Sequence, residues 1–503
     1  MSYKKVFYSI LTIFSVSIVA KALGFLRETF LANYFGTSLE IDLYYLVYGI
    51  FFALSGIIGS SIGIAYIPEH FKNKSYSNWK EKSYEMFLFT GIISFFIVLI
   101  TFLFADDFGK MLNSNGTINS LEKIVYYIKI NSLAFFFQTL TFFLVAVLNA
   151  EKKFGRGELI GTAYSLTVIF SLFFLYERLG IQAIIYSFLI SSVCTFIILY
   201  LYIYGVRYYL PKVSIKYYIL ITSATLIGTS TIYIGQIYDR IIASRLVEGS
   251  QSALSYSGNI HSLVNVFFIV SIVNVIYSEL NSYDKESLEF KTNVSRLVSF
   301  SFSLFSIILI PLSLFLYLYS SEVVSIIFKR GNFGDYSVSL TSDVFQMYVI
   351  GSFFFALRDL GNKLFYTFDN RKIPIYLGIV FLFINFALCY ILALFMGVKG
   401  ISLAVTITSL FYMIYVLFLL WKKYSIYIKR RNLYDFFKII FFCLIVYILF
   451  YCFPNWLEFG TSKTDKIFSL ILSGVIYVVS YLIYCYIINI SLIRNNVFKL
   501  FKK

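Results

Sequence analysis

The residues best suited to chemistry lie in the stretch Ala20–Gly36, where Lys21, Arg27 and Glu28 interrupt a long apolar run. A charge at the centre of a bilayer costs about 2.5–3.5 kcal/mol on insertion scales, so such side chains usually face a protein interior or a water-filled cavity. Lys21, Gly24 and Glu28 are spaced by three and four residues and share one helical face, with Arg27 beside it. This mainly basic face predicts a cavity that receives an anion. The alternative is that the long basic side chains reach the headgroups at the far side of the bilayer.

Two further charge clusters lie in apolar segments nearer the C-terminus. Arg240 is either a second counterpart of Arg27 or an anchor at the membrane interface. Arg358, Asp359 and Lys363 lie together in a later apolar segment. Asp359 and Lys363 are four residues apart with the acid first, which predicts an ion pair along a helix. Such a pair either joins elements structurally or opens as a gate, and the cost of burying an unpaired charge favours the structural role.

The histidines and cysteines give weaker signals. His261 lies in a polar-laced segment with Asn259, and it either takes part in a proton relay or lines a wet surface between lobes. His70 follows a proline and a glutamate and is predicted to lie at the surface. No metal spacing, phosphate loop, nucleophile motif or carboxylate pair occurs, so we expect neither an enzyme nor a cofactor. The scattered cysteines indicate small buried hydrophobic residues: Cys194, Cys389, Cys443, Cys452 and Cys485.

The composition sets the class of protein. The chain has 503 residues, of which 59% are hydrophobic and 14% are charged, whereas about 25% of residues are charged in soluble domains. Apolar runs of about 20 residues predict helices, because the strands of a membrane barrel are only about 10 residues long. We therefore expect an all-α polytopic membrane protein. The net charge of +16 does not indicate nucleic-acid binding, because the basic excess lies in short loops between spans, where it sets orientation.

Apolar windows predict about fourteen transmembrane helices. Two segments between them, Phe108–Leu121 and Glu322–Phe333, mix apolar and polar residues and are predicted either as helices in the headgroup layer or as ordered loops. The approximate spans are 6–33, 41–67, 85–104, 123–148, 158–176, 180–204, 217–245, 253–278, 296–320, 340–368, 373–394, 398–421, 436–453 and 467–490.

The loops between these spans alternate in charge. One set is basic, as at Lys72–Lys82, Lys152–Arg156 and Lys422–Arg431, and the other is poorer in basic residues or balanced, as at Asp106–Asp107 and Glu458–Asp465. By the positive-inside rule the basic loops and both termini are cytoplasmic. The sequence therefore predicts a multi-pass protein of the bacterial cytoplasmic (inner) membrane, with a retained first helix instead of a removed signal peptide.

A weak internal repeat divides the chain. Arg27 precedes a glycine by nine residues, and so does Arg240. Lys152 precedes a Gly-Ile pair by 28 residues, and so does Lys372. This symmetry predicts two parallel six-helix lobes around a central cavity, followed by a C-terminal helix pair, which is a transporter plan. The predicted parts are the N-lobe at 1–210, the C-lobe at 211–425, and the helix pair with its basic tail at 426–503.

Five segments carry a family resemblance. They read KALGFLRE at Lys21–Glu28, FGTS at Phe35–Ser38, AYIPEHF at Ala65–Phe71, IIFKRGNF at Ile326–Phe333, and a longer match at Phe355–Pro374. In this order they resemble the MurJ (MviN) lipid II flippases, which belong to the multidrug/oligosaccharidyl-lipid/polysaccharide exporter superfamily. The resemblance runs from the first predicted helix to about the twelfth.

The resemblance implies a V-shaped pair of MATE-like lobes and a cationic central cavity for a pyrophosphate. Lys21 falls where the family usually has an arginine, whereas Arg27 and Asp42 match a family arginine and aspartate. Asp42 also fits a purely structural role as a cap of the second helix. Two departures are that Phe52–Gly56 lacks the arginine of the family's second helix, and that Gly258–Asn259 stands in place of an Asp-Arg pair in the eighth.

These features predict a flippase that moves an undecaprenyl-pyrophosphate-linked glycan precursor, lipid II or a related lipid-linked oligosaccharide, to the outer leaflet by alternating access. The expected partners are this lipid, the bilayer and envelope-synthesis enzymes, and the last two spans are candidates to hold the lipid tail. The membrane potential or a coupling ion is expected to supply the drive. The alternatives are a cation-coupled small-molecule or multidrug exporter of the same superfamily, and a membrane scaffold for envelope-synthesis enzymes.

Overall fold

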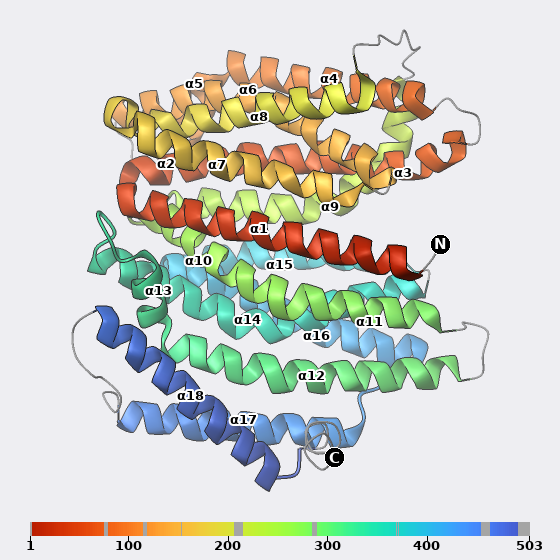
Figure 1. The fold of residues 1–503 in the computed structure, drawn as a ribbon, viewed down its shortest axis with the longest axis vertical. Coiled ribbons are helices and arrows are strands. Elements are labelled where there is room, and N and C mark those ends of the chain that lie inside the picture. Colours follow the sequence, from red (N-terminus) through yellow and green to blue (C-terminus); the bar gives the residue numbers. More distant parts are fainter. Residues whose placement is uncertain are drawn as a thin grey trace. The chain divides into compact units, whose positions relative to one another are not determined.

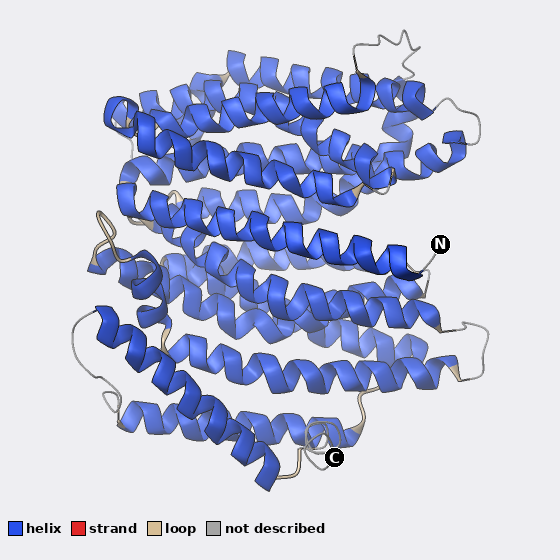
Figure 2. Cartoon of the chain, viewed as in Figure 1, coloured by secondary structure: helices blue, strands red, loops and turns tan. Residues whose placement is uncertain are grey.

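The computed structural model describes residues 3–74, 79–113, 118–151, 153–205, 215–283, 289–368, 370, 372–453 and 463–490. Within these ranges every regular element is a helix, as Figure 2 shows by colour. The chain divides into two compact units, Met1–Ser252 and Ala253–Lys503. The predicted all-α fold class is therefore confirmed.

The first unit is built around the long helix α6, which contacts α2, α3, α4 and α8 (Figure 1). Helix α7 packs along α1 and against α8. The elements of this unit are α1 (Tyr3–Phe35), α2 (Leu39–Ser55), the π-helical turn η1 (Gly56–Ser60), α3 (Ser61–Lys74), α4 (Trp79–Leu103), α5 (Ala105–Leu112), α6 (Ile118–Ala150), α7 (Phe154–Leu179), α8 (Gln182–Tyr204) and α9 (Ile215–Ala243).

The second unit is built around α14, which contacts α12, α13 and α16. Helix α15 packs on α16, and α17 packs on α12. Its elements are α10 (Ser250–Val264, which begins at the end of the first unit), the π-helical turn η2 (Asn265–Val270), α11 (Ser271–Ser282), α12 (Phe290–Leu318), α13 (Ser320–Phe328), α14 (Asp335–Thr367), α15 (Lys372–Met396), α16 (Val398–Tyr424), α17 (Arg430–Cys452) and α18 (Lys463–Ile487).

The described residues contain 11 helices that are long and apolar enough to cross a membrane, or up to 12 if the bent helix α9 counts as one span. They coincide with predicted spans, and the two remaining predicted spans, 6–33 and 158–176, fall on α1 and α7. Two of the predicted spans each cover three elements, because π-helical turns interrupt Leu39–Phe71 and Ser250–Tyr277. Helices suited to cross a membrane thus match 11 or 12 of the predicted spans in the described residues, and the count of about fourteen stays a prediction.

Close helix packing explains why small residues follow α2. A methyl group at Gly59 would lie 2.5 Å from the backbone oxygen of Thr139 on α6. Only glycine allows the two backbones to approach so closely, a device common between membrane helices. The segment η1 therefore holds the α2–α3 span against α6.

Helix α9 packs with the first unit. The predicted repeat places this helix in the C-lobe, from residue 211 onward, but its contacts are with α2, η1 and α3. The first compact unit therefore includes α9 and ends at Ser252, while the lobes predicted at 1–210 and 211–425 stay a prediction. The charged residues at the end of α9 consequently belong to the same unit as those of α1 and α2.

The two segments predicted as surface helices or loops contain short helices. Helix α5 covers Ala105–Leu112 and exposes Phe108 and Met111, and α13 covers Ser320–Phe328. The part of Phe108–Leu121 at 114–117 lies outside the described residues. Helices, and not plain loops, thus begin both segments.

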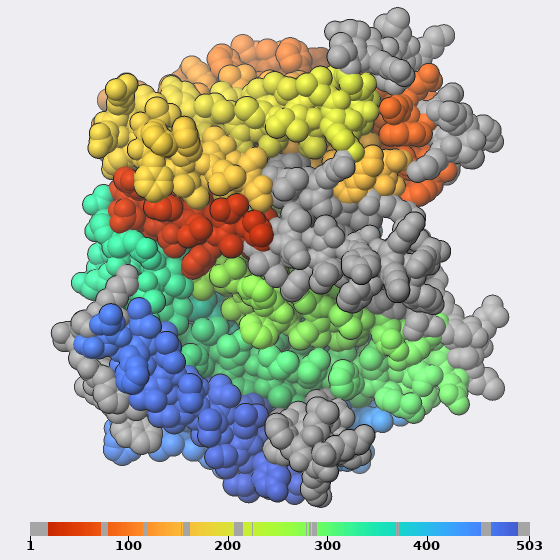
Figure 3. All heavy atoms as spheres, in the orientation of Figure 1, coloured from red at the N-terminus to blue at the C-terminus, as the bar shows by residue number. Residues whose placement is uncertain are grey.

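The C-terminal helix pair is anchored to α12 of the same unit. Ile439, Phe442, Tyr481 and Cys485 form a small core with Leu314 and its neighbours on α12. The atoms of α18 lie on the face that Figure 3 shows. Apolar side chains of this helix, such as Phe468, are exposed. An exposed apolar helix surface in a membrane protein is suited to contact with lipid.

Candidate functional site

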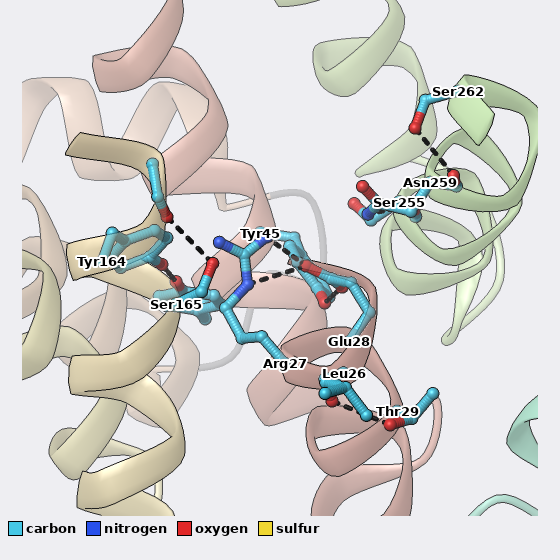
Figure 4. Close-up of polar contacts among 12 residues, drawn as sticks. Leu26, Arg27, Glu28, Thr29, Tyr45, Tyr164, Ser165, Ser255, Asn259 and Ser262 are labelled. Carbon is cyan, nitrogen blue, oxygen red and sulfur yellow. Dashed lines mark hydrogen bonds and ion pairs between the residues drawn. The ribbon is translucent and has the colours of Figure 1, made fainter. Parts of the chain in front are cut away.

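Arg27 and Glu28 form a buried ion pair on α1. Arg27 Nη2 and Nε donate to Glu28 Oε1 over 2.5 and 3.1 Å. The second carboxylate oxygen, Oε2, accepts a hydrogen bond of 2.5 Å from the hydroxyl of Tyr45 on α2. Figure 4 shows this arrangement, with Arg27 between Glu28 and Tyr164 of α7. Glu28 is 1% exposed and the Arg27 side chain 15%, so the pair lies in the protein and Arg27 keeps limited access.

A tyrosine cluster, Tyr44, Tyr48 and Tyr164, lies beside the guanidinium and contacts it through Tyr164. The Arg27 Cζ atom lies 4.7 Å from the centroid of the Tyr164 ring, a cation–π distance. Tyr48 stacks between Tyr44 and Tyr164, with ring centroids 5.4 and 5.6 Å away, and the hydroxyls of Tyr44 and Tyr164 contact each other. Tyr164 thus contacts the guanidinium as a cation–π partner, while the Nε and Nη2 edge is bonded to Glu28.

Asp42 binds the backbone where α10 begins. Its Oδ2 accepts the N–H of Gly249 over 2.7 Å, and its Oδ1 accepts the N–H of Ser252 over 2.8 Å. A carboxylate at this position satisfies amides that lack a helical partner and complements the positive end of the helix. Asp42 therefore caps a helix, but the helix is α10 and not α2, whose cap the sequence suggested.

Arg240 is fixed against α2. Its Nη1 donates to the carbonyl of Tyr45 over 2.9 Å, and its side chain lies beside Gly49. The backbone carbonyl of Arg240 accepts a hydrogen bond from Gln251 Nε2. Arg240 thus lies in the same unit as Arg27, and Tyr45 links the two arginines through its hydroxyl, bonded to Glu28, and its carbonyl.

The first unit brings together Arg27, Glu28, Asp42 and Arg240 of the predicted cavity residues. Lys21, which shares a helical face with Glu28 in the sequence pattern, is exposed and is not part of the ion pair. The residues of the predicted basic face therefore have different environments in the structure. Glu28 is buried and holds Arg27, whereas Lys21 lies nearly two turns earlier on the helix.

In the second unit, the charges of α14 pair differently from the prediction. Arg358 Nε donates to Asp359 Oδ1 over 3.1 Å, and Arg358 Nη1 donates to Ser409 Oγ over 3.1 Å. The Lys363 ammonium lies 4.8 Å from the centroid of the Tyr277 ring. The predicted i,i+4 pair of Asp359 with Lys363 is therefore wrong. Half-exposed Asp359 reaches its neighbour instead, and Lys363 turns to an aromatic face.

Asn259 and His261 on α10 each have a polar partner in the second unit. His261 is buried, its Nε2 lies 3.3 Å from Ser352 Oγ, and its ring stacks on Tyr348 at 5.6 Å between centroids. Asn259 donates to the carbonyl of Ser255 over 2.8 Å. These contacts lie within the second unit, and they hold His261 against α14 and Asn259 on its own helix.

One buried polar cluster was not predicted. His70 is 0% exposed, so the prediction of a surface histidine is wrong. Its Nδ1 lies 2.8 Å from the hydroxyl of Tyr66, and its Nε2 lies 2.9 Å from Glu151 Oε1 at the end of α6. The only local signal is the four-residue spacing of Tyr66 and His70, because the carboxylate comes from a distant segment. The described residues contain no group of side chains suited to a metal ion.

The chain matches known membrane transporters along most of its length. It is 24% identical over 502 residues to a protein of Buchnera aphidicola described as a probable lipid II flippase MurJ, covering 94% of this chain and 95% of the relative. It is also 24% identical over 499 residues to a lipid II flippase MurJ of Thermosipho africanus, covering 98% of both chains.

Solved structures show the same fold. A lipid II flippase MurJ in an inward closed conformation matches with a TM-score of 0.81 at 21% identity, covering 96% of this chain and 100% of the other. An inward-facing multidrug resistance MATE transporter of the MOP superfamily matches with a TM-score of 0.66 at 14% identity, covering 83% of this chain and 98% of the other. The sequence model of the family described as lipid II flippase MurJ matches residues 31–467. The chain belongs to the lipid II flippase MurJ family.

Proposed function

We propose that this protein moves an isoprenoid-pyrophosphate-linked glycan, lipid II or a close relative, from the cytoplasmic to the outer leaflet of the bacterial inner membrane. Family membership supports this class of substrate. The single structural observation that carries the proposal is Arg27, a guanidinium held in the tyrosine cluster of an apolar helix bundle. A site of low dielectric strengthens its attraction for a phosphate compared with water.

Arg27 offers donors that a phosphate group can use. Its Nε and Nη2 are bonded to Glu28, whereas Nη1 makes no hydrogen bond within the described residues. Guanidinium groups recognise phosphates through paired N–H donors, which give both strength and orientation. In the proposed cycle Arg27 binds the pyrophosphate, Lys21 adds positive charge nearby, and the isoprenoid tail stays in the bilayer against apolar helix surfaces such as α18.

The cycle alternates access between the two leaflets through movement of two lobes, with both termini in the cytoplasm. No chemical cofactor takes part, and the membrane potential or a coupling ion supplies the drive. Enzymes of envelope synthesis supply the lipid on one side and consume it on the other. Arg358 and Lys363 join α14 to α16 and α11 through Ser409 and Tyr277, which favours a structural role over gating. Family membership argues against the multidrug-exporter and scaffold alternatives.

The proposal is tested with the full-length protein in lipid vesicles that contain a fluorescent undecaprenyl-pyrophosphate-linked glycan. Flipping is followed as the fraction of label that an impermeant quencher reaches. We expect the protein to accelerate flipping and Arg27→Ala to abolish it. Flipping by the Arg27→Ala protein at the normal rate would remove this residue from the site, and absence of flipping by the unaltered protein would contradict the proposed function.

A further inference from the structure

Glu28 is fixed more firmly than a chance neighbour of Arg27 would be. Its two oxygens have separate partners, because Oε1 accepts from Arg27 and Oε2 accepts from the Tyr45 hydroxyl at 2.5 Å. The carboxylate is 1% exposed and bridges α1 to α2. The bond to Tyr45 does not involve Arg27, so it can hold the Glu28 carboxylate in place when the guanidinium turns away.

A carboxylate and a phosphate compete for the same guanidinium. Both anions accept paired N–H donors in similar geometry. Glu28 already engages Nε and Nη2, which form the edge of the guanidinium best suited to a bidentate anion. In a buried site the negative charge of Glu28 also reduces the positive potential that an incoming pyrophosphate meets. The pair therefore limits how tightly an anion binds to Arg27.

Resting on the proposed function, we propose that Glu28 is a positioning residue that acts through Arg27 as a built-in counter-anion. It is bonded to the guanidinium while the site is empty, and the ion pair forms again when the pyrophosphate leaves. Such a residue weakens the binding of the pyrophosphate and thereby speeds its release, because tighter complexes mostly dissociate more slowly. Glu28 itself binds no substrate, and Tyr45 keeps its carboxylate in place through the cycle.

The variant Glu28→Gln removes the charge and keeps the shape. We measure its affinity for undecaprenyl pyrophosphate by titration of the full-length protein in vesicles, and its flipping rate with the fluorescent lipid. Affinity should rise about tenfold, the factor that corresponds to a modest electrostatic gain. Flipping at saturating lipid should fall by a similar factor, because release becomes slower.

Two further variants test whether the effect passes through Arg27. In an Arg27→Ala background, Glu28→Gln should change the affinity no further, because the partner through which it acts is gone. Glu85→Gln is the matched control in the same unit, because Glu85 is also buried, binds Lys82 Nζ at 2.8 Å, and accepts a hydrogen bond from Tyr218. It should lose stability without a change in affinity or in flipping rate.

The outcomes separate the two proposals. Normal binding and flipping by Arg27→Ala would overturn the proposed site itself. Loss of binding in Arg27→Ala, together with unchanged or weaker binding in Glu28→Gln, would overturn only the role of Glu28. Equal losses of stability and flipping in Glu28→Gln and Glu85→Gln, without tighter binding, would show that Glu28 is structural.

Discussion

The guanidinium of Arg240 occupies the space that a side chain at position 49 would need, so this arginine can pack against α2 only because residue 49 is glycine. In this position Arg240 Nη1 donates a hydrogen bond to the carbonyl of Tyr45 over 2.9 Å. Tyr45 is also the residue that holds Glu28. A glycine on α2 thus determines how α9 meets the part of the molecule that holds Arg27.

The variant Gly49→Ala should displace Arg240 and destabilise the protein by about 1–3 kcal/mol, the usual cost of overpacking. Flipping should also fall, because the bond to Tyr45 is lost with the displacement. Thermal unfolding of the purified protein and the vesicle assay measure the two effects. Gly161→Ala on α7 is the control, since a methyl group there meets no atom within 4 Å. Equal losses in both variants would contradict the packing argument.

The variant Arg27→Ala should abolish flipping while expression and insertion stay normal, because removing a charge does not make a helix harder to insert. Arg27→Lys should restore only part of the activity, since an ammonium lacks the planar fork of the guanidinium. Lys21→Ala should weaken lipid binding less than Arg27→Ala, because exposed Lys21 is outside the tyrosine cluster. Comparison of protein level and flipping rate checks all three. Full rescue by lysine would mean that charge alone matters.

Tyr481 donates a hydrogen bond to a backbone carbonyl of α12 that lacks its helical donor. Pro311 has no N–H, so the carbonyl of Ile307, four residues earlier, lacks its helical donor. The hydroxyl of Tyr481 donates to this carbonyl over 3.0 Å, and Tyr477 donates to the carbonyl of Pro311 over 2.9 Å. Backbone groups in a membrane must be satisfied inside the protein, so these bonds tie α18 to α12.

The variant Tyr481→Phe should therefore destabilise the protein by about 1–3 kcal/mol, the cost of leaving a buried acceptor unpaired. In a Pro311→Ala background the same change should cost less, because the new N–H at position 311 satisfies Ile307. Thermal unfolding of the two single variants and the double variant measures the difference. An equal cost of Tyr481→Phe in both backgrounds would mean that packing of the ring, and not the hydrogen bond, anchors α18.

The predicted orientation is testable by labelling single cysteines with an impermeant thiol reagent. The native cysteines are first replaced, since Cys194 and Cys452 are exposed. In intact cells Lys72→Cys should stay unlabelled, whereas Asp107→Cys, at a side chain that is 71% exposed, should react. The asymmetry of loop charge is the reason for this expectation. Labelling of position 72 from outside would reverse the topology.

Sequence reasoning located the helices well because hydropathy is a local property. Runs of about 20 apolar residues indicate each span. The π-helical turns η1 and η2 inside two of these spans were not predicted. The contacts of α9 could not be derived in the same way. A repeat in sequence predicts homologous lobes, but which helices pack together depends on surfaces such as Gly49 and Arg240, and their fit is not written in the periodicity.

The charged residues of the site were found from their types, but most of their partners were not. Arg27 and Glu28 are conspicuous as charges in an apolar run, whereas Tyr45 and Tyr164 are two of 44 tyrosines in the chain. His70 was predicted at the surface because its carboxylate partner, Glu151, lies 81 residues away on another helix. Adjacent charges at Arg358 and Asp359 paired with each other, against the helical spacing rule. The partners of these charged side chains thus depend on contacts between helices, which the spacing of residues within one helix does not specify.

Asp42 gives the last prediction. Its Oδ2 accepts the backbone N–H of Gly249 and its Oδ1 accepts that of Ser252, where the chain passes into α10. In Asp42→Asn only one oxygen remains, and the amide group would turn its own N–H toward an N–H donor. The loss should destabilise the protein by about 1–3 kcal/mol, the cost of a buried donor without a partner.

Flipping by Asp42→Asn should fall as well, since the start of α10 loses its fixed position, while affinity for undecaprenyl pyrophosphate should stay within about threefold of normal because the carboxylate is occupied by backbone amides. Glu248→Gln is the matched control: Glu248 accepts the N–H of Leu39 over 2.7 Å, and glutamine keeps an acceptor for it. The control should keep its stability and its flipping rate. Normal stability with clearly tighter lipid binding in Asp42→Asn would instead show that Asp42 acts as an electrostatic brake on the substrate, and the cap would then be incidental.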